Sequence, residues 1–197
     1  MDGTKDRDWT FYAFFCYARN FVISHGYDRE IEWCKNRTFD QITSDEFRAQ
    51  YRFAVFSSSG LSNKVVQKIE AAFDAANEAG LNAFETIPNR RMRAAIMWMY
   101  PHYHEVFRDL KLLKTDAEKI QFLQGLMQIG PKESRHLARN LGINCVKPDR
   151  HMERMAEHWG YQNPDAMCFA VQGYEQERLG VIDVILWRYG NLTGEYE

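Results

Sequence analysis

The sequence predicts an all-α protein, and three observations support this prediction. The long segments repeat their apolar residues at helical spacing, and none of useful length alternates with a period of two. Capping residues precede the apolar runs, and Gly or Pro follows them. The chain contains no internal repeat, low-complexity stretch or Pro/Gly-rich linker. With 197 residues it is long enough to bury a sizeable core, as one domain or two joined lobes.

The first half of the chain contains four candidate segments. Trp9 to Ser24 is aromatic almost all round, which indicates a buried helix between two lobes. Tyr27 to Cys34 forms a short helix or loop. A helix capped near Thr43 stops at residues 57–60, where small polar residues form a turn or approach a phosphate backbone. The apolar face of the next helix comprises Leu61, Val65, Val66, Ile69, Ala72, Phe73 and Ala76.

The second half continues the helical pattern. Pro88 opens a helix that Pro101 breaks, and its inward residues are Met92, Ala95, Ile96 and Met99. Asp116 caps a helix over 117–127, which leads into a tight turn at 129–131 and a further helix from Lys132. The three remaining helices are expected to begin at Pro148-Asp149, begin at Asn163-Pro164-Asp165, and cover Val181 to Tyr189 with Gly190 as terminator.

Composition places the protein inside the cell. The charged N-terminus shows no signal peptide, and no apolar run approaches membrane-spanning length. The four cysteines (Cys16, Cys34, Cys145 and Cys168) lack CxxC and iron–sulfur spacing, so we expect reduced core thiols. We therefore expect a protein of the cytoplasm and nucleoid, or of the nucleus in a eukaryote. The net charge of −2 is not typical of a nucleic-acid-binding protein, although phosphate binding requires only a local basic face.

His102, His104 and Glu105 lack a second ligand pair at usable spacing, so no metal is predicted. Basic residues gather in two groups, each of which is more typical of a solvated helix face than of a DNA site. They are Arg90, Arg91 and Arg93, and then Lys132, Arg135, Arg139, Lys147, Arg150 and Arg154.

The run from Phe122 to His151 places Lys132 and Asp149 at the N-termini of two successive helices. A helix N-terminus offers unpaired N–H groups and a partial positive charge, so Asp149 stays ionised there. Two interpretations fit this spacing. In the structural one, Asp149 is an N-cap, Pro131 occupies the first helical position, and Lys132 is solvated. In the functional one, the lysine and the carboxylate act together.

This run resembles the hairpin-to-aspartate stretch of the helix-hairpin-helix (HhH-GPD) DNA glycosylases. The closest resemblance is to the archaeal-type second class of 8-oxoguanine DNA glycosylase/AP lyase. The matching residues are Ile129-Gly130, Lys132-Glu133, His136, Arg139-Asn140, Gly142 and Asp149-Arg150-His151, and the ending 179–194 is also similar. The resemblance implies two helical lobes with an active-site cleft between them. Residues 1–45 would pack with 146–197 as one lobe, and 46–145 would form the bundle containing the hairpin.

The resemblance implies a base-excision-repair enzyme acting on double-stranded DNA that contains a damaged base. Lys132 would be the nucleophile that attacks the sugar C1′ and forms a Schiff base, which permits strand cleavage. Asp149 would stabilise the sugar cation and help to move protons. Lysine suits this role because its pKa can be lowered, whereas that of arginine cannot. No cofactor is implied, and a monomer is expected.

The remaining site residues follow by position. The DNA-contacting candidates are Ser58, Ser59, Gly60, Leu61, Gln128, Gly130, Arg135, Arg139 and Arg150. Trp9, Phe11 and His136 are candidates for gripping an extruded base, with core or helix-face packing as the alternative. The hairpin departs from the usual Leu-Pro-Gly-x-Gly. Gln128 must tolerate a turn that glycine adopts freely, and Pro131 lacks an N–H, so a weaker phosphate anchor is expected.

The identity of the base is left open. The resembled class recognises 8-oxoguanine partly through a C-terminal lysine, and this chain has Tyr196-Glu197 there. The lead is 8-oxoguanine or another oxidised purine, and an alkylated, mismatched or otherwise modified base suits the same scaffold. Two non-enzymatic hypotheses also remain: a DNA-binding protein that retains the hairpin, and a helical protein unrelated to DNA.

Overall fold

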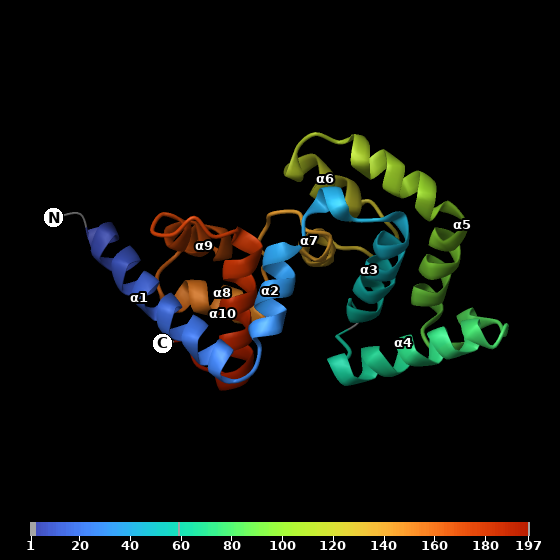
Figure 1. Ribbon diagram of the computed structural model, residues 1–197, viewed down its shortest axis with the longest axis horizontal. Coiled ribbons are helices and arrows are strands. Elements are labelled where there is room, and N and C mark those ends of the chain that lie inside the picture. Colours follow the sequence, from blue (N-terminus) through green and yellow to red (C-terminus); the bar gives the residue numbers. More distant parts are fainter. Residues whose placement is uncertain (1–2, 59, 197) are drawn as a thin grey trace. The chain divides into compact units, whose positions relative to one another are not determined.

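The computed structural model describes residues 3–58 and 60–196, and within these ranges it contains helices and no strand (Figure 1). The all-α prediction is confirmed. The α-helices of the described residues are α1 (Gly3–Ser24), α2 (Asp28–Asn36), α3 (Ser44–Ser57), α4 (Asn63–Glu78), α5 (Arg90–Leu112), α6 (Asp116–Gln124), α7 (Pro131–Asn140), α8 (Arg150–His158), α9 (Pro164–Gln172) and α10 (Leu179–Thr193). Short 3-10 helices cover Phe39–Gln41 and Ala83–Thr86.

The chain forms two compact units. The first unit combines residues 1–39 with 142–197, and the second comprises residues 40–141. The lobes expected from the sequence have their boundaries at residues 45 and 145, and that division, like the cleft between the lobes, stays a prediction.

The first unit packs α1, α2, α8 and α9 around the apolar helix α10. Phe11, Phe14 and Phe15 of α1 enter this core, whereas Trp9 and Tyr17 are 59% and 56% exposed. The expectation that α1 is buried all round is therefore wrong. Its aromatic residues divide between a core face and an exposed face, because one side of a helix suffices to cover α10.

Helix α10 continues past Gly190, contrary to the sequence prediction. It ends at Thr193, and the C-cap residue is Gly194, whose φ of +70° is left-handed. Gly190 is buried inside the helix, where an added Cβ would lie 3.3 Å from Tyr196 and 3.6 Å from the His151 Cβ. This glycine permits close packing against α8 and the C-terminal segment rather than ending the helix.

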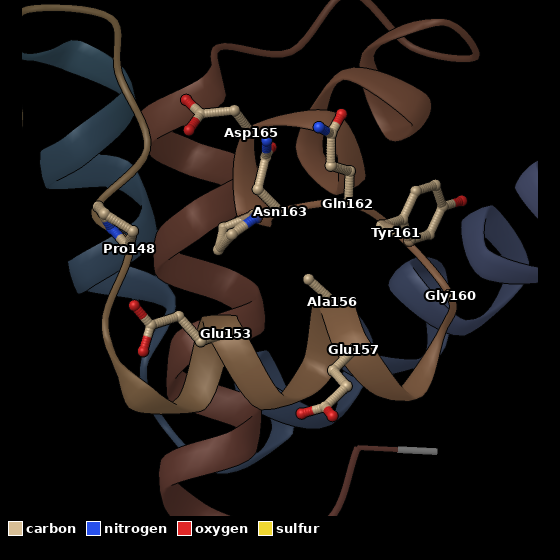
Figure 2. A pocket seen from close by; sticks show the side chains of 10 residues that line it. Pro148, Glu153, Ala156, Glu157, Gly160, Tyr161, Gln162, Asn163 and Asp165 are labelled. Carbon is tan, nitrogen blue, oxygen red and sulfur yellow. The ribbon is translucent and has the colours of Figure 1, made fainter.

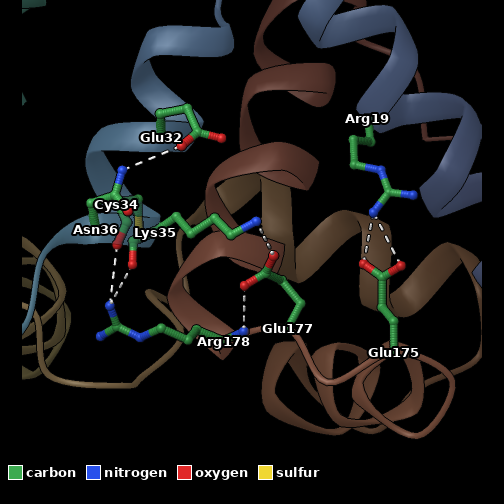
Figure 3. A network of polar contacts seen from close by, with 8 residues as sticks. All are labelled: Arg19, Glu32, Cys34, Lys35, Asn36, Glu175, Glu177 and Arg178. Carbon is green, nitrogen blue, oxygen red and sulfur yellow. Dashed lines mark hydrogen bonds and ion pairs between the residues drawn. The ribbon is translucent and has the colours of Figure 1, made fainter.

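Arg178 links the two segments of the first unit, residues 1–39 and 142–197, and Figure 3 shows its side chain beside the end of α2. Its guanidinium donates hydrogen bonds to the carbonyl oxygens of Cys34 (3.2 Å), Arg37 and Gly142 (2.6 Å). Gly142 has a φ of +80°, and an added Cβ would lie 2.7 Å from the Thr38 carbonyl carbon. Only glycine fits at this position, because the backbone of residues 37–39 packs directly against it.

In the second unit, α3 packs against α4, α5 and α7. The predicted cap of α3 is confirmed as a capping box, in which Thr43 and Glu46 satisfy each other's backbone N–H groups. Arg52 of α3 bonds to Glu70 at 3.0 Å and to Asp74 at 2.8 Å, which links α3 to α4. The central position of α3 matters for the site, because α7 carries Lys132.

Three expectations for the second unit need correction. Helix α5 runs through Pro101 and bends part-way along its length (Figure 1), because Phe107 and Leu110 beyond the proline are buried and hold the last turns in place. The N-cap of α6 is Thr115 rather than Asp116. On α4, Val66, Ile69, Phe73 and Ala76 are buried as predicted, whereas Val65 and Ala72 are exposed, as is Leu61, which precedes the helix.

Candidate active site

The hairpin that precedes α7 has a strained residue. Its turns close through hydrogen bonds from Leu126 N–H to the Leu123 carbonyl and from Ile129 N–H to the Leu126 carbonyl, both at 3.1 Å. Among the described residues other than glycine, Gln128 alone has a positive φ, at +62°. This left-handed conformation costs a non-glycine residue roughly 1–2 kcal/mol. The prediction that Gln128 adopts a turn favoured by glycine is confirmed.

The N-terminus of α7 lacks a side-chain cap. Gly130 is the N-cap residue and Pro131 occupies the first turn, as the structural interpretation predicted. Within the described ranges, no group accepts a hydrogen bond from the backbone N–H of Gln128 or of Gly130. Lys132 lies in this first turn and is exposed. The hairpin and helix start therefore present backbone donors and a cation together, which suits an anion.

Helix α3 fixes α7 along its length. The Asn140 side chain donates to the Gln50 side chain at 3.1 Å, and the His136 ring meets the Phe53 ring edge-on at a centroid distance of 5.6 Å. Both α7 side chains are buried. The helix-face packing interpretation of His136 thus fits the structure, and its role in gripping a base stays a prediction. Arg135 and Arg139 are half-buried on the same helix.

Asp149 caps α8, and this prediction is confirmed. Its Oδ1 accepts hydrogen bonds from the backbone N–H groups of His151 (2.9 Å) and Met152 (3.2 Å). Within the described part of the chain, Oδ2 accepts none. The carboxylate is half-buried, and Arg150 next to it is exposed. A helix N-terminus favours a carboxylate at this position, and one of the two Asp149 oxygens accepts no hydrogen bond from a described residue.

A buried carboxylate with no role expected from the sequence is linked to Asp149 through the backbone of Lys147. Asp183 of α10 is 0% exposed, and its Oδ2 accepts from the Lys147 N–H at 3.2 Å. The Lys147 carbonyl in turn accepts from the Asp149 N–H at 2.9 Å. The pKa of the Cys168 thiol is raised by burial and by the nearby Asp183 charge. The signal in the sequence is a single acidic residue inside the apolar run 181–187.

His151 is the second residue of α8. Its Nδ1 lies 3.3 Å from the Tyr196 hydroxyl. Burial lowers the pKa of His151, Arg150 and Arg154 lower it further, and Asp149 opposes the shift. The ring is therefore predominantly neutral near pH 7.

The other predicted DNA-contacting residues follow α3. The Ser58 hydroxyl donates to the Val55 carbonyl at 2.7 Å, Gly60 has a φ of +72°, and Leu61 is 37% exposed. Ser59 lies outside the described residues. These observations place a turn and an exposed apolar side chain before α4, and contact with DNA stays a prediction.

The two aromatic residues proposed for the base pocket have different environments. Phe11 is fully buried, with its ring 5.2 Å from those of Trp159 and Tyr161. Trp9 is exposed and lies against Tyr12 and Tyr174, at centroid distances of 5.9 and 5.6 Å. Phe11 therefore belongs to the core of the first unit, and Trp9 to its surface.

A pocket of about 870 Å³ in the first unit lies between α8 and the segment leading into α9 (Figure 2). Glu153 and Glu157 of α8 and Asp165 of α9 line it, and Asp149 is not among its lining residues. Three carboxylates disfavour a phosphate backbone, so we do not assign this pocket to DNA.

The described residues contain neither a cluster of metal-binding side chains nor a membrane-spanning helix. No group of three or more His, Cys, Asp or Glu residues there could hold a metal ion. No helix there is long and apolar enough to cross a bilayer.

Lys132 belongs to the second unit and Asp149 to the first. Each occupies the helix N-terminus that the sequence predicted. Their approach across a sugar stays a prediction.

Comparison with solved structures identifies the fold. The 8-oxoguanine DNA glycosylase of Thermotoga maritima matches with a TM-score of 0.65 and 16% identity, covering 96% of this chain and 99% of that chain. The 8-oxoguanine glycosylase/lyase of Methanocaldococcus jannaschii, in complex with a 15-mer DNA containing 8-oxoguanine, matches with 0.61 and 14%, covering 92% and 98%. Another structure of that enzyme matches with 0.62 and 15%, covering 93% and 95%. No protein-family model and no curated protein matches the sequence. The chain therefore has the fold of these glycosylases over nearly its whole length.

Proposed function

We propose that this protein is a base-excision-repair DNA glycosylase with AP-lyase activity, and that its target is an oxidised purine such as 8-oxoguanine in double-stranded DNA. The observation that carries the proposal is the fold shared with 8-oxoguanine DNA glycosylases over 96% of the chain, with a lysine in the first turn after the hairpin and an aspartate capping the next helix. The solved neighbours supply the substrate class. The fold alone leaves an alkylated, mismatched or otherwise modified base as the alternative target.

The chemistry follows from the two side chains. The damaged base leaves the stack, and the unprotonated Lys132 Nζ attacks the sugar C1′. The N-glycosidic electron pair departs with the base, which takes up a proton. The lysine adduct opens to a Schiff base, loses a proton from C2′, and expels the 3′ phosphate. Asp149 stabilises the positive charge that develops on the sugar, and its Oδ2 is the oxygen not used in capping.

DNA binding is assigned to backbone and basic groups near these residues. The N–H groups of Gln128 and Gly130 would bind a phosphate, supported by Arg135 and Arg139 on α7 and by Arg150 on α8. Ser58, Ser59, Gly60 and Leu61 would follow the strand near the damaged base. These contacts need neither a cofactor nor a second subunit, and we propose that the protein acts as a monomer.

Borohydride trapping tests the proposal. Duplexes carrying 8-oxoguanine, an alkylated purine, uracil, or an abasic site are incubated with the protein and reduced. We expect a covalent protein–DNA complex with the abasic duplex and with at least one base lesion. Lys132→Gln should abolish trapping, because glutamine cannot form a Schiff base.

The matched control is Lys5→Gln, which removes another exposed lysine from the first turns of a helix. It should trap as well as the wild type does. Equal trapping by Lys132→Gln and the wild type would refute the lyase mechanism. Salt-dependent DNA binding without base release or trapping would instead establish a non-catalytic DNA-binding protein.

A further inference from the structure

Tyr51 of α3 contacts the hairpin through one hydrogen bond. The side chain is 0% exposed, and its hydroxyl donates to the Met127 carbonyl oxygen at 2.8 Å. Its ring lies 6.5 Å from that of Phe47, which is also fully buried. Burial raises the pKa of Tyr51 far above its ordinary value of 10.0, so the hydroxyl keeps its proton and remains a donor.

The acceptor of this bond belongs to the peptide that joins Met127 to Gln128. A trans peptide is planar, and its C=O and N–H point in opposite directions. The structure contains no cis peptide among the described residues. Since the Met127 carbonyl is directed to the buried Tyr51 hydroxyl, the Gln128 N–H is directed away from it. Within the described ranges, nothing accepts a hydrogen bond from that N–H.

The same peptide precedes the strained residue of the hairpin. Gln128 has a φ of +62°, which a non-glycine residue adopts only when its surroundings hold it there. Tyr51 lies on the same helix as Gln50 and Phe53, which contact Asn140 and His136 of α7. One helix therefore supports both the hairpin peptide and the helix that carries Lys132.

We propose that Tyr51 is a positioning residue for DNA binding, which orients the Met127–Gln128 peptide so that the Gln128 N–H donates to a backbone phosphate. This inference rests on the proposed function, since it names how the hairpin of that site is held in its binding shape. Glycine would adopt the positive φ of residue 128 without strain. Because residue 128 is glutamine, the Tyr51 hydroxyl holds the preceding peptide in the orientation that this turn requires.

The test is the affinity for a duplex containing a stable abasic-site analogue, measured at low salt for Tyr51→Phe. This change removes a single oxygen atom. We expect binding about five- to tenfold weaker, the loss that corresponds to one hydrogen bond. Adding Gln128→Gly to Tyr51→Phe should restore most of the lost affinity, because glycine adopts the turn without support.

The matched control is Tyr161→Phe in the first unit, which removes another buried hydroxyl that donates a hydrogen bond, to Asp8 at 2.9 Å. It should lose stability without losing affinity. Urea unfolding of each variant shows that it is folded.

The outcomes separate the two proposals. Wild-type protein that does not bind the abasic duplex overturns the proposed function. Wild-type protein that binds, with Tyr51→Phe binding as well as Tyr161→Phe does, overturns the role of Tyr51 alone. Lost affinity in Tyr51→Phe that Gln128→Gly leaves unchanged also overturns it, because the defect then does not arise from the turn at Gln128.

Discussion

The N-termini of α7 and α8 have the same physical problem and opposite solutions. Both expose backbone N–H groups and a partial positive charge. At α8, the Asp149 carboxylate accepts two of those N–H groups. At α7, the N-cap is Gly130, which has no side chain to do so. Lys132 adds a positive charge to the first turn and Glu133 a negative one, but no side chain caps the backbone N–H groups.

The difference shows which of the two helices has its first backbone N–H groups capped by the protein itself. Helix α8 carries its own anion, so its first turn is stable without a ligand. Helix α7 and the hairpin before it keep their donors available for an anion from outside, which in the proposed function is a DNA phosphate. Changes at Asp149, Gly130 and His151 should alter this contrast, with effects that decrease in that order.

The largest effect is expected from removing the charge of Asp149 while keeping its cap. Asparagine caps a helix as well as aspartate, so Asp149→Asn should cost less than about 1 kcal/mol of unfolding free energy. Base release should fall by about 100- to 1,000-fold, as when a group that stabilises transition-state charge is lost. Single-turnover base release and urea unfolding measure the two quantities.

Asp149→Ala separates the cap from the chemistry. It should lose a further 1 kcal/mol or so of stability, because both backbone donors lose their acceptor. Thr115→Ala removes the comparable cap of α6 and should cost similar stability with normal base release. Full activity in Asp149→Asn would mean that the carboxylate is a cap and nothing more.

A smaller effect is expected from giving α7 the cap that it lacks. Gly130 has an extended conformation (φ −84°, ψ −176°) that any residue adopts, and an added Cβ would meet the flexible Glu133 carboxylate, at 3.2 Å. Gly130→Asp should stabilise the protein by about 0.5 kcal/mol. Affinity for abasic-site duplex should fall about fivefold or more, since like charges about 4 Å apart in water repel by about 1 kcal/mol.

Gly130→Asn is the control that adds a cap without a charge. It should bind duplex more tightly than Gly130→Asp does, and the difference between the two variants should shrink as salt is added. Equal affinity of Gly130→Asp and the wild type would show that α7 does not approach a phosphate.

The smallest effect concerns pH at the α8 start. The pKa of His151 is lowered from 6.5, chiefly by burial, so the folded state binds the proton less well than the unfolded state does. The unfolding free energy should therefore fall as the pH drops below 6.5, and His151→Gln should remove that part of the decrease. Unfolding measured between about pH 5 and 8 checks this.

Asp149→Asn should lower the pKa of His151 further, because the carboxylate is the group that raises it. An NMR titration of the His151 ring in the two proteins provides the comparison. A higher pKa in the variant would contradict the electrostatic account of this helix start.

Local signals predicted the helix starts well. The caps at Thr43, Asp149 and Asn163 and the N1 proline of α7 follow from residues within one turn of each other, and the structure contains all of them. Where two adjacent residues could both cap a helix, the prediction from the sequence was wrong. Thr115 rather than Asp116 caps α6, because the hydroxyl reaches the third residue of the helix and Glu118 completes the capping box.

Residues that commonly end helices predicted the helix ends less reliably than capping residues predicted the helix starts. Pro101 and Gly190 both lie inside helices that continue beyond them. Burial of Phe107 and Leu110 holds the end of α5, and close packing against His151 uses Gly190 in α10. Each outcome depends on residues distant in the sequence, so composition near the proline or glycine could not decide it.

The sequence by itself determined the all-α class, the starts of α3, α7, α8 and α9, and the placement of Lys132 and Asp149 at two helix N-termini, because those features arise from contacts within a few residues. Only the tertiary structure decided which distant side chains contact these segments. Tyr51 donates a hydrogen bond to the hairpin, Asp183 accepts one from the backbone just before Asp149, and Arg178 donates one to the segment that begins at residue 142. Each of these joins residues more than 30 positions apart, at distances that follow from packing rather than from sequence spacing.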